Sequence, residues 1–495
     1  MEPGDIFTVV VDAGTAGEIT MEGVDPAAQF ELAVINLSQG LGTATLQMSG
    51  DLSAHPDIAK AATAGNDSAD RWVDLSVQEA LEEELRGLEL ALAVSHQQQD
   101  AGAMSLAKAA SAARPPQLGQ TERFFVIGGL SGSRRPVEVT GRIACVTQDT
   151  VFYVDTEVDE RSPRDLTQAD VDTLCRDFQR TVEAELALFG EVSDVNDDGR
   201  VAVLLTPQVN RLGSSQGGFV TGFFNAQDLY VGRTSNNREI LHVMVPDSIG
   251  IYGMVVEKAF VLENLLPAVL PHELQHAISY NQHVLAGGGA PEDAWLNEGL
   301  SHLAEDLLGF GVENPSRYAV YLDRPDVYPL VSAGSPGLAA RGGIFLLLRY
   351  LYEQHPDGAA FLRRLVQSGQ VGVPNLEAAF ASDDTGFDQF GEFLMRWSAT
   401  LLLNNRGISA DPRFRYRTPT TAESGNLQGV CTVCSVDDNR STQLHGVMAY
   451  PFSTMGGVAL ETAAVKFFEI ASAVPSLDFL APETADFAVV LVRVK

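Results

Sequence analysis

The sequence predicts an α+β protein in which a helix-rich central section lies between two strand-rich ends. Residues 1–50 contain β-branched and alternating apolar segments, which are typical of strands. Between 121 and 410, several longer segments repeat apolar residues at helical spacing, and after 411 strand patterns return together with more proline, threonine and glycine. We therefore expect an N-terminal β-sandwich-like domain (1–66), a helix with a linker (67–120), a central domain (121–410) and a C-terminal β-sandwich domain (411–495).

The segment before residue 121 combines a helix with a connector. Ser76-x-x-Glu79 is a capping-box pattern, and it opens a helix with an apolar stripe and an acidic opposite face. The stripe consists of Leu81, Leu85, Leu88 and Leu92, and the acidic face of Glu82, Glu83 and Glu84. Residues 96–120 are rich in glutamine, alanine, serine and proline, which indicates an exposed connector open to proteolysis. One hypothesis is that residues 1–118 form a removable pro-segment.

Composition limits the partners of this chain. Its net charge of −32 argues against nucleic acid or an anionic membrane surface, because both need a basic face on the protein. No uninterrupted apolar run is long enough to span a bilayer. We also expect the protein to be a monomer. Met1–Gly4 shows no signal peptide, so an exported protein would be present here as its mature segment with an added methionine.

Four cysteines support export. An even, low number suits one or two disulfides in an oxidising compartment. Cys431-x-x-Cys434 stands without a second pair, which disfavours a structural zinc site. We predict a local disulfide between Cys431 and Cys434 and a second one between Cys145 and Cys175, in a secreted, cell-surface or periplasmic protein.

The segment around P-H-E-L-Q-H carries the chemistry. His272 and His276 are spaced i, i+4, so both imidazoles project from one helix face and can bind one zinc ion. Glu273 lies beside that ion as the general base. A longer motif with a third histidine fails, because Gln282 occupies the place where that histidine is required. The alternative is a glutamate from a second helix, and Glu298 in W-L-N-E-G is the candidate.

The second helix carries two further polar residues on the same face as Glu298. His302 and Glu305 follow it at i+4 and i+7, where either side chain can support an imidazole ligand. For His302, a solvated helix residue is the competing interpretation.

These motifs resemble a known group. H-E-L-Q-H followed by W-L-N-E-G-L-S-H-L-A-E-D is similar to the gluzincin metallopeptidases, most closely the hyicolysin family. Three other segments share the resemblance, at 194–206, 217–224 and 235–240. It implies a thermolysin-like zinc endopeptidase domain that acts on protein or peptide, with His272, His276 and Glu298 as zinc ligands and Glu273 as base.

The sequence departs from the family pattern at two places. Pro271 precedes the first histidine, so the metal-binding helix is expected to begin near Pro267 or to kink at Pro271. Arg341 stands where the family leads us to expect tyrosine. The donor that would stabilise the oxyanion therefore stays open among Arg341, Tyr318, Tyr321 and a downstream histidine.

A second cation is suggested by D-V-N-D-D-G-R. Asp194, Asn196 and Asp198 match the first positions of a calcium loop, although Leu205 occupies the position of the bidentate glutamate. An Asp/Gly turn between a helix and a strand is the competing interpretation. Two other functions also stay open for the chain as a whole. These are a catalytically silent surface binding module and a zinc hydrolase that acts on a non-peptide substrate.

Overall fold

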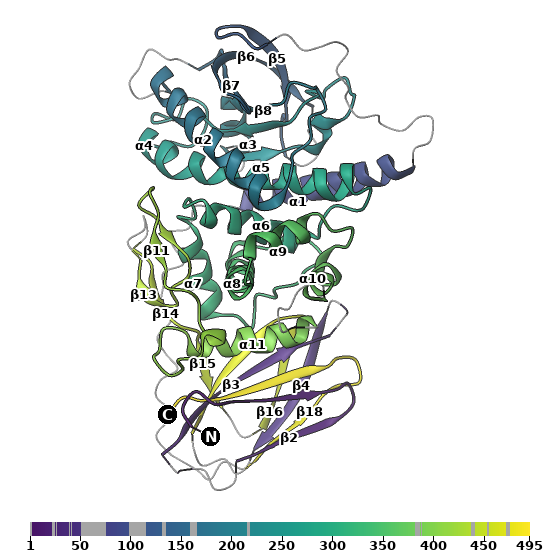
Figure 1. The fold of residues 1–495 in the computed structure, drawn as a ribbon, viewed down its shortest axis with the longest axis vertical. Coiled ribbons are helices and arrows are strands. Elements are labelled where there is room, and N and C mark those ends of the chain that lie inside the picture. Colours follow the sequence, from purple (N-terminus) through teal and green to yellow (C-terminus); the bar gives the residue numbers. More distant parts are fainter. Residues whose placement is uncertain are drawn as a thin grey trace. The chain divides into compact units, whose positions relative to one another are not determined.

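The computed structural model describes residues 2–495 except 22–24, 26, 39, 41, 51–75, 99–114, 131–134, 159–165, 215–217, 382–386, 388, 437–440, 453–454 and 472–475. Helices and strands are both abundant, which confirms an α+β protein (Figure 1). The chain forms two compact units. Unit 1 comprises residues 1–70, 313–358 and 376–495, and unit 2 comprises residues 71–312 and 359–375.

Unit 1 contains a two-sheet β-sandwich built from both ends of the chain. One sheet has the strand order β1-β19-β3-β17-β15 and the other β16-β4-β18-β2. The N-terminal strands are β1 (Ile6–Val11), β2 (Ala16–Thr20), β3 (Gln29–Asn36) and β4 (Thr43–Gly50). The C-terminal strands are β15 (Ala449–Pro451), β16 (Met455–Glu461), β17 (Val465–Ala471), β18 (Ser476–Leu480) and β19 (Phe487–Arg493).

This arrangement corrects the prediction of two separate sandwiches. β3 lies between β17 and β19, and antiparallel pairing joins Leu32 to Phe468 on one side and to Leu491 on the other. Leu32, Phe468 and Leu491 all belong to the apolar core between the sheets. Because β1–β4 share both sheets with β16–β19, removal of residues 1–118 would dismantle the sandwich. The structure therefore argues against a pro-segment with that boundary.

Helices and two small hairpins complete unit 1. The helices are α7 (Asn314–Asp323), α8 (Leu338–Gln354), α11 (Phe390–Leu403) and the short η5 (Pro412–Phe414). The hairpins pair β11 (Thr420–Thr421) with β12 (Leu427–Gln428) and β13 (Val433–Ser435) with β14 (Gln443–His445). The predicted Cys431–Cys434 disulfide is present. Helices α9 (Gly358–Val366) and α10 (Gly372–Ala381) lie where the chain crosses between the units.

Unit 2 is organised around a six-stranded sheet with the order β5-β6-β7-β8-β10-β9. The strands are β5 (Thr121–Val126), β6 (Val137–Val146), β7 (Thr150–Asp155), β8 (Val201–Leu205), β9 (Gly222–Phe224) and β10 (Ile240–Val243). β9 runs antiparallel to β10 and forms one edge of the sheet. β9, which contacts α5, is thus an edge strand.

The helices of unit 2 pack against this sheet and each other. They are α1 (Ser76–Gln98), α2 (Gln168–Phe189), α3 (Pro207–Ser214), α4 (Lys258–Phe260), α5 (Leu266–Tyr280) and α6 (Ala294–Leu307). A 3-10 turn, η2 (Ala226–Leu229), follows β9. α5 contacts β9, β10, α2 and α6, so it lies at the centre of the unit. The predicted Cys145–Cys175 disulfide joins β6 to α2.

Helix α5 accommodates both prolines. π-helical turns precede and follow it, η3 (Val261–Leu265) and η4 (Asn281–Ala286). Pro267 lies in the first turn of α5, directly after the π-helical turn η3, which continues into this helix. Pro271 lies inside the helix and removes one backbone hydrogen bond there.

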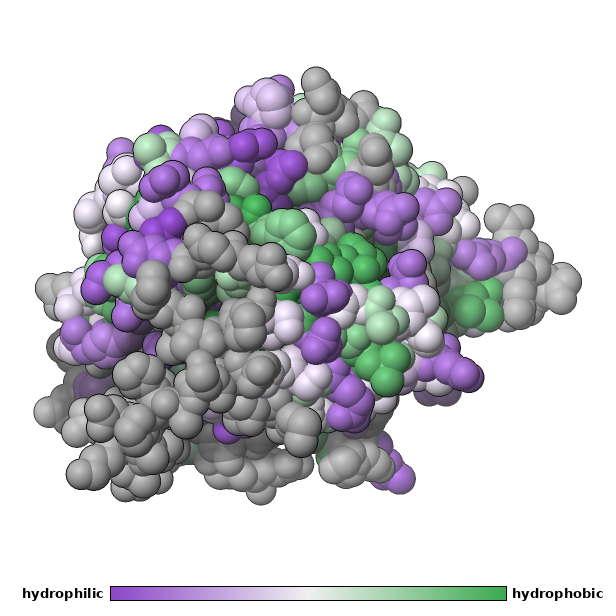
Figure 2. Space-filling view, turned by 90° about the horizontal axis from the view of Figure 1, so that it is seen from below, coloured by the Kyte–Doolittle hydropathy of each residue, from purple (hydrophilic) through white to green (hydrophobic). Residues whose placement is uncertain are grey.

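None of the described helices has the length and apolarity needed to cross a bilayer. In the face shown in Figure 2, hydrophobic side chains lie scattered among hydrophilic ones. Exposed large apolar residues of the sandwich, such as Phe7 and Leu480, are likewise separated in the sequence.

Candidate metal centre

Two adjacent helices of unit 2 supply the candidate ligands. His272 and His276 lie one turn apart on α5, and Glu298 lies on α6, which packs against α5. Only 6% of His272, 1% of His276 and none of Glu298 is exposed. Three ionisable side chains buried together need mutual pairing or a bound cation, because isolated buried charges are strongly disfavoured.

The spacing of these three side chains fits one zinc ion. Glu298 Oε2 lies 3.4 Å from His272 Nε2, and Glu298 Oε1 lies 3.6 Å from His276 Nε2. The three ligand atoms all lie within 4.8 Å of one another. Two ligand atoms bound tetrahedrally at about 2.0–2.1 Å from zinc are about 3.3 Å apart. The donor set of two imidazoles and one carboxylate is also one that zinc accepts.

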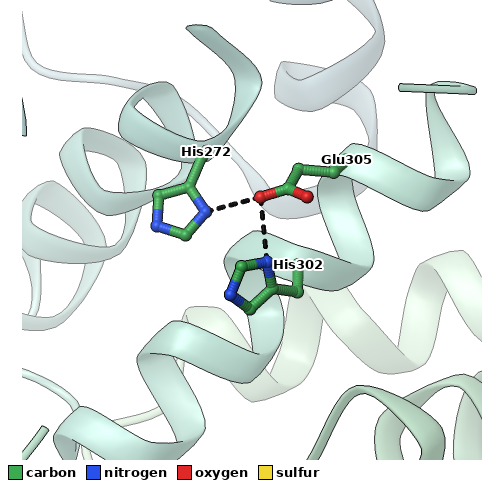
Figure 3. Close-up of side chains that lie close together, drawn as sticks. All are labelled: His272, His302 and Glu305. Carbon is green, nitrogen blue, oxygen red and sulfur yellow. Dashed lines mark hydrogen bonds and ion pairs between the residues drawn. The ribbon is translucent and has the colours of Figure 1, made fainter. Parts of the chain in front are cut away.

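Glu305 connects two histidines from its place on α6. Its Oε1 lies 2.8 Å from His272 Nδ1 and 2.9 Å from His302 Nδ1 (Figure 3). Burial opposes ionisation of this carboxyl, but the two histidines outweigh it and hold the pKa of Glu305 well below its usual range. The carboxylate therefore accepts from His272 Nδ1–H, which leaves Nε2 directed at Glu298.

His272, His302 and Glu305 form a second group with metal-ligand spacing. The two groups share His272, so they are alternative sites for its imidazole. Glu305 Oε1 is already an acceptor for both histidines of this group. We therefore favour the site formed with His276 and Glu298, in which Glu305 orients a ligand. His302 is 1% exposed, so the interpretation as a solvated helix residue is wrong.

The two candidate imidazole ligands differ in protonation. Burial, followed by the charge of Arg86, holds the pKa of His276 well below its usual value, so this ring is neutral, as a ligand must be. Burial also opposes the charge on His272, but the hydrogen bonds to Glu298 and Glu305 outweigh it and raise the pKa of His272 to about 10. Binding of a metal would displace the Nε2 proton.

Sequence reasoning missed the support of His276. The Ser301 hydroxyl donates to Gln275 Oε1 at 2.7 Å and lies 3.3 Å from His276 Nδ1. Because the hydroxyl proton is used, its oxygen can only accept from the imidazole. Nε2 lies 3.4 Å away, almost as close as Nδ1, so this contact does not select a tautomer. Ser301 follows Glu298 by three residues on α6, so helical spacing was a usable signal.

Glu273 lies between helix α5 and the edge strand β9. Its Oε2 accepts a 2.8 Å hydrogen bond from the backbone N–H of Phe224 in β9. Burial raises the pKa of Glu273 to about 7, and the charges of His272, Glu82 and Arg86 modify that value. A carboxyl with a pKa near neutrality suits a group that takes up and returns a proton.

The three named candidates for the oxyanion donor all belong to unit 1. The Tyr318 hydroxyl donates to Cys431 O at 3.2 Å. Arg341 is 2% exposed and its guanidinium donates to Pro336 O at 2.7 Å and Ser335 Oγ at 3.0 Å. Tyr321 is fully buried, and its hydroxyl has no hydrogen-bond partner among the described residues. Nothing in these contacts selects one of the three.

The candidate calcium loop joins α2 to β8. Asp194 Oδ1 accepts from the backbone N–H groups of Asp198 and Gly199, at 3.0 and 3.2 Å, and Asn196 Nδ2 donates to Asp198 Oδ2 at 2.7 Å. These bonds are those of a tight Asx-type turn. Calcium at this loop stays a prediction.

Comparison with known proteins gives one informative match. No protein-family model matches the chain. The neutral metalloprotease ShpI of Staphylococcus hyicus is 25% identical over 221 residues, which make up 43% of this chain and 48% of that protein. The chain thus spans about half the length of this relative. The match supports a distant relationship with a metalloprotease, and it does not extend to the hyicolysin family specifically.

Proposed function

We propose that this chain is a zinc-dependent endopeptidase. One observation carries the proposal. The two imidazoles of α5 and the carboxylate of α6 are buried at ligand spacing, and Glu273 lies beside them against a sheet edge. The similarity to a metalloprotease supports the same reaction class. The gluzincin type, with His272, His276 and Glu298 as ligands, is part of the proposal.

The residues of the chain have distinct roles in this reaction. When bound, zinc would lower the pKa of a water molecule and polarise the scissile carbonyl group. The Phe224 N–H holds one oxygen of Glu273 at 2.8 Å, which leaves the other oxygen to accept the proton of the attacking water. Glu273 then delivers that proton to the leaving nitrogen. Glu305 holds the His272 imidazole in the tautomer that this arrangement needs, and the Ser301 hydroxyl contacts the His276 imidazole.

The edge strand suits a peptide substrate. β9 pairs with β10 on one side only, so its other side can hydrogen-bond to an extended main chain by β-augmentation. We propose that protein or peptide lies here. We also propose that the protein works outside the cytoplasm, since its two disulfides need an oxidising compartment.

Glu273→Gln tests the proposal directly. The variant keeps the shape of the side chain but cannot accept the proton, so zinc content stays at that of the wild type while casein hydrolysis falls by about 100-fold or more. Glu263→Gln, an exposed residue of η3, is the matched control and keeps full activity. Zinc is measured by elemental analysis, and wild-type activity should disappear with a chelator.

Two results would reject the proposal. Equal hydrolysis by Glu273→Gln and wild type would exclude Glu273 as the base. A wild type that binds zinc but cleaves no member of a peptide library would leave the silent binding module or the non-peptide hydrolase.

A further inference from the structure

Helix α1 buries a stripe of polar side chains beside its buried leucines and exposes two other apolar side chains. Gln78, Glu82, Arg86 and Glu89 follow one another at helical spacing and are 8%, 4%, 9% and 2% exposed. Leu90 and Val94, in contrast, are 53% and 43% exposed. A helix that only packed on a core would do the reverse. The buried stripe therefore indicates that α1 faces a polar site. Glu82, which the sequence placed on an acidic outer face, lies inside.

One end of this stripe occupies the edge of the sheet. The Gln78 carboxamide accepts from Thr221 N–H at 3.1 Å and donates to Gly222 O at 3.2 Å. The C=O and N–H of one residue in an added strand would present the same acceptor and donor to this edge. Glu82 holds the carboxamide in place, because Gln78 Nε2 also donates to Glu82 Oε1 at 2.7 Å.

The middle of the stripe is close to the candidate metal centre. The charges of Glu82 and Arg86 act on Glu273, that of Arg86 acts on His276, and those of Glu89 and Glu298 act on each other. Arg86 contacts Glu89 at 3.1 Å, but Nε and Nη1 of its guanidinium have no hydrogen-bond partner among the described residues. Burying hydrogen-bond donors without partners is costly. These two nitrogens of Arg86 therefore still need an acceptor that the described residues do not supply.

The far end of α1 is attached to the loop after the metal-binding helix. Gln97 Nε2 donates to Gly288 O at 3.2 Å and to Gly289 O at 2.7 Å. His96 also packs edge-on against Tyr230, just after η2. The helix thus runs from the edge strand, past Glu273 and His276, to the end of η4.

We propose that α1 is a built-in inhibitor that occupies the place of the peptide substrate on β9, a proposal that rests on the proposed peptidase function. Gln78 takes the hydrogen bonds of a substrate main chain, and Arg86 and Glu89 cover the centre. Substrate can pair with β9 only when α1 has moved away. The first strands do not move with it, because β1–β4 are held in the sandwich by strands β16–β19. Activation therefore releases α1 alone, whose neighbours in the chain, 51–75 and 99–114, lie outside the described residues.

Substitutions on the inner face of α1 test this proposal in the full chain. The double variant Gln78→Ala/Glu82→Ala removes the two hydrogen bonds to Thr221 and Gly222, at the start of β9, and leaves the ligands and Glu273 in place. We expect kcat/KM for a quenched fluorescent peptide library to rise by about tenfold or more, since two hydrogen bonds of ordinary net strength are lost. Glu83→Ala, on the exposed side of the same helix, should leave kcat/KM unchanged.

Circular dichroism, thermal unfolding and zinc content establish that each variant is folded and loaded. With both intact, an unchanged or lower kcat/KM for the double variant overturns the proposal, and a lower value would assign α1 to the catalytic machinery. If no form of the protein cleaves peptide, the proposed peptidase function fails. The proposal that α1 occupies the peptide site is then tested separately, by peptide binding. Fluorescence polarisation with labelled extended peptides then supports it if the double variant binds more tightly, and overturns it if binding is equal.

Discussion

Glu305 is the residue through which the orientation of the first metal-binding histidine can be tested most directly. Its carboxylate accepts from Nδ1 of His272 at 2.8 Å and from Nδ1 of His302 at 2.9 Å. Glu305→Gln keeps the size of the side chain but removes its charge. Both histidines bond to the same oxygen, Oε1, so the amide oxygen can take its place, but a neutral amide is a weaker acceptor than a carboxylate.

The expected effect is a loss of zinc affinity. Removing the outer partner of a metal-binding histidine typically weakens binding 10–100-fold. That range corresponds to about 1.4–2.7 kcal/mol. Competition with a chromogenic chelator at pH 7.5 measures the dissociation constant, and Glu191→Gln, an exposed carboxyl of the same unit, should leave it unchanged.

Two companion variants separate the alternative metal groups. If zinc is held by His272, His276 and Glu298, His276→Ala abolishes stoichiometric binding, whereas His302→Ala changes the dissociation constant by less than about tenfold. The opposite pattern, with zinc lost in His302→Ala and kept in His276→Ala, would place the ion at the group drawn in Figure 3 and refute our choice.

Three further predictions concern other parts of the molecule. Burial raises the pKa of Glu185 well above its usual value, so the folded protein keeps a proton that the unfolded chain releases above about pH 4.3, and stability falls as pH rises. In zinc-stripped protein, Glu185→Leu should therefore stabilise more at pH 8 than at pH 4.5 in urea unfolding, and an equal effect at both would contradict this. If the loop at Asp194 binds calcium, millimolar Ca²⁺ raises the melting temperature of the wild type but not of Asp198→Ala; no shift in either supports a simple turn. Deletion of residues 2–50 should abolish cooperative unfolding of the sandwich, because β3 is lost from between β17 and β19, and a retained transition would show that unit 1 folds without it.

Local patterns predicted the parts of the site that lie within one helix or one helical hairpin. The i, i+4 spacing placed His272 and His276 on one face of α5, and the i+7 spacing placed Glu305 on the same side of α6 as Glu298. Both disulfide pairings were also predicted correctly. Such contacts depend on helix geometry and on a small number of cysteines, so a single sequence contains enough information for them.

Pairings between distant segments were not predictable in the same way. The alternation in Gln29–Asn36 correctly assigned Phe30, Leu32 and Val34 to a core face, but alternation does not name a partner strand. The partners turned out to lie more than 400 residues later. The boundary between the compact units at 312/313 likewise falls inside the predicted 121–410 domain, where no change in composition marks it.

Helix α1 shows how a correct secondary-structure prediction can still assign the wrong face. Leu81, Leu85 and Leu92 are buried as expected, and the helix begins at the capping box. Glu82, Glu83 and Glu84 were assigned to an acidic opposite face, because the surface is the usual place of charge on a helix. Here Glu82 and Arg86 are close enough to shift the pKa of Glu273, and Arg86 also shifts that of His276. A polar stripe on an amphipathic helix thus reveals which face is buried only once a polar site is known to lie against that face. This is also why the variants at Gln78 and Glu82, rather than at the leucines, decide what α1 does.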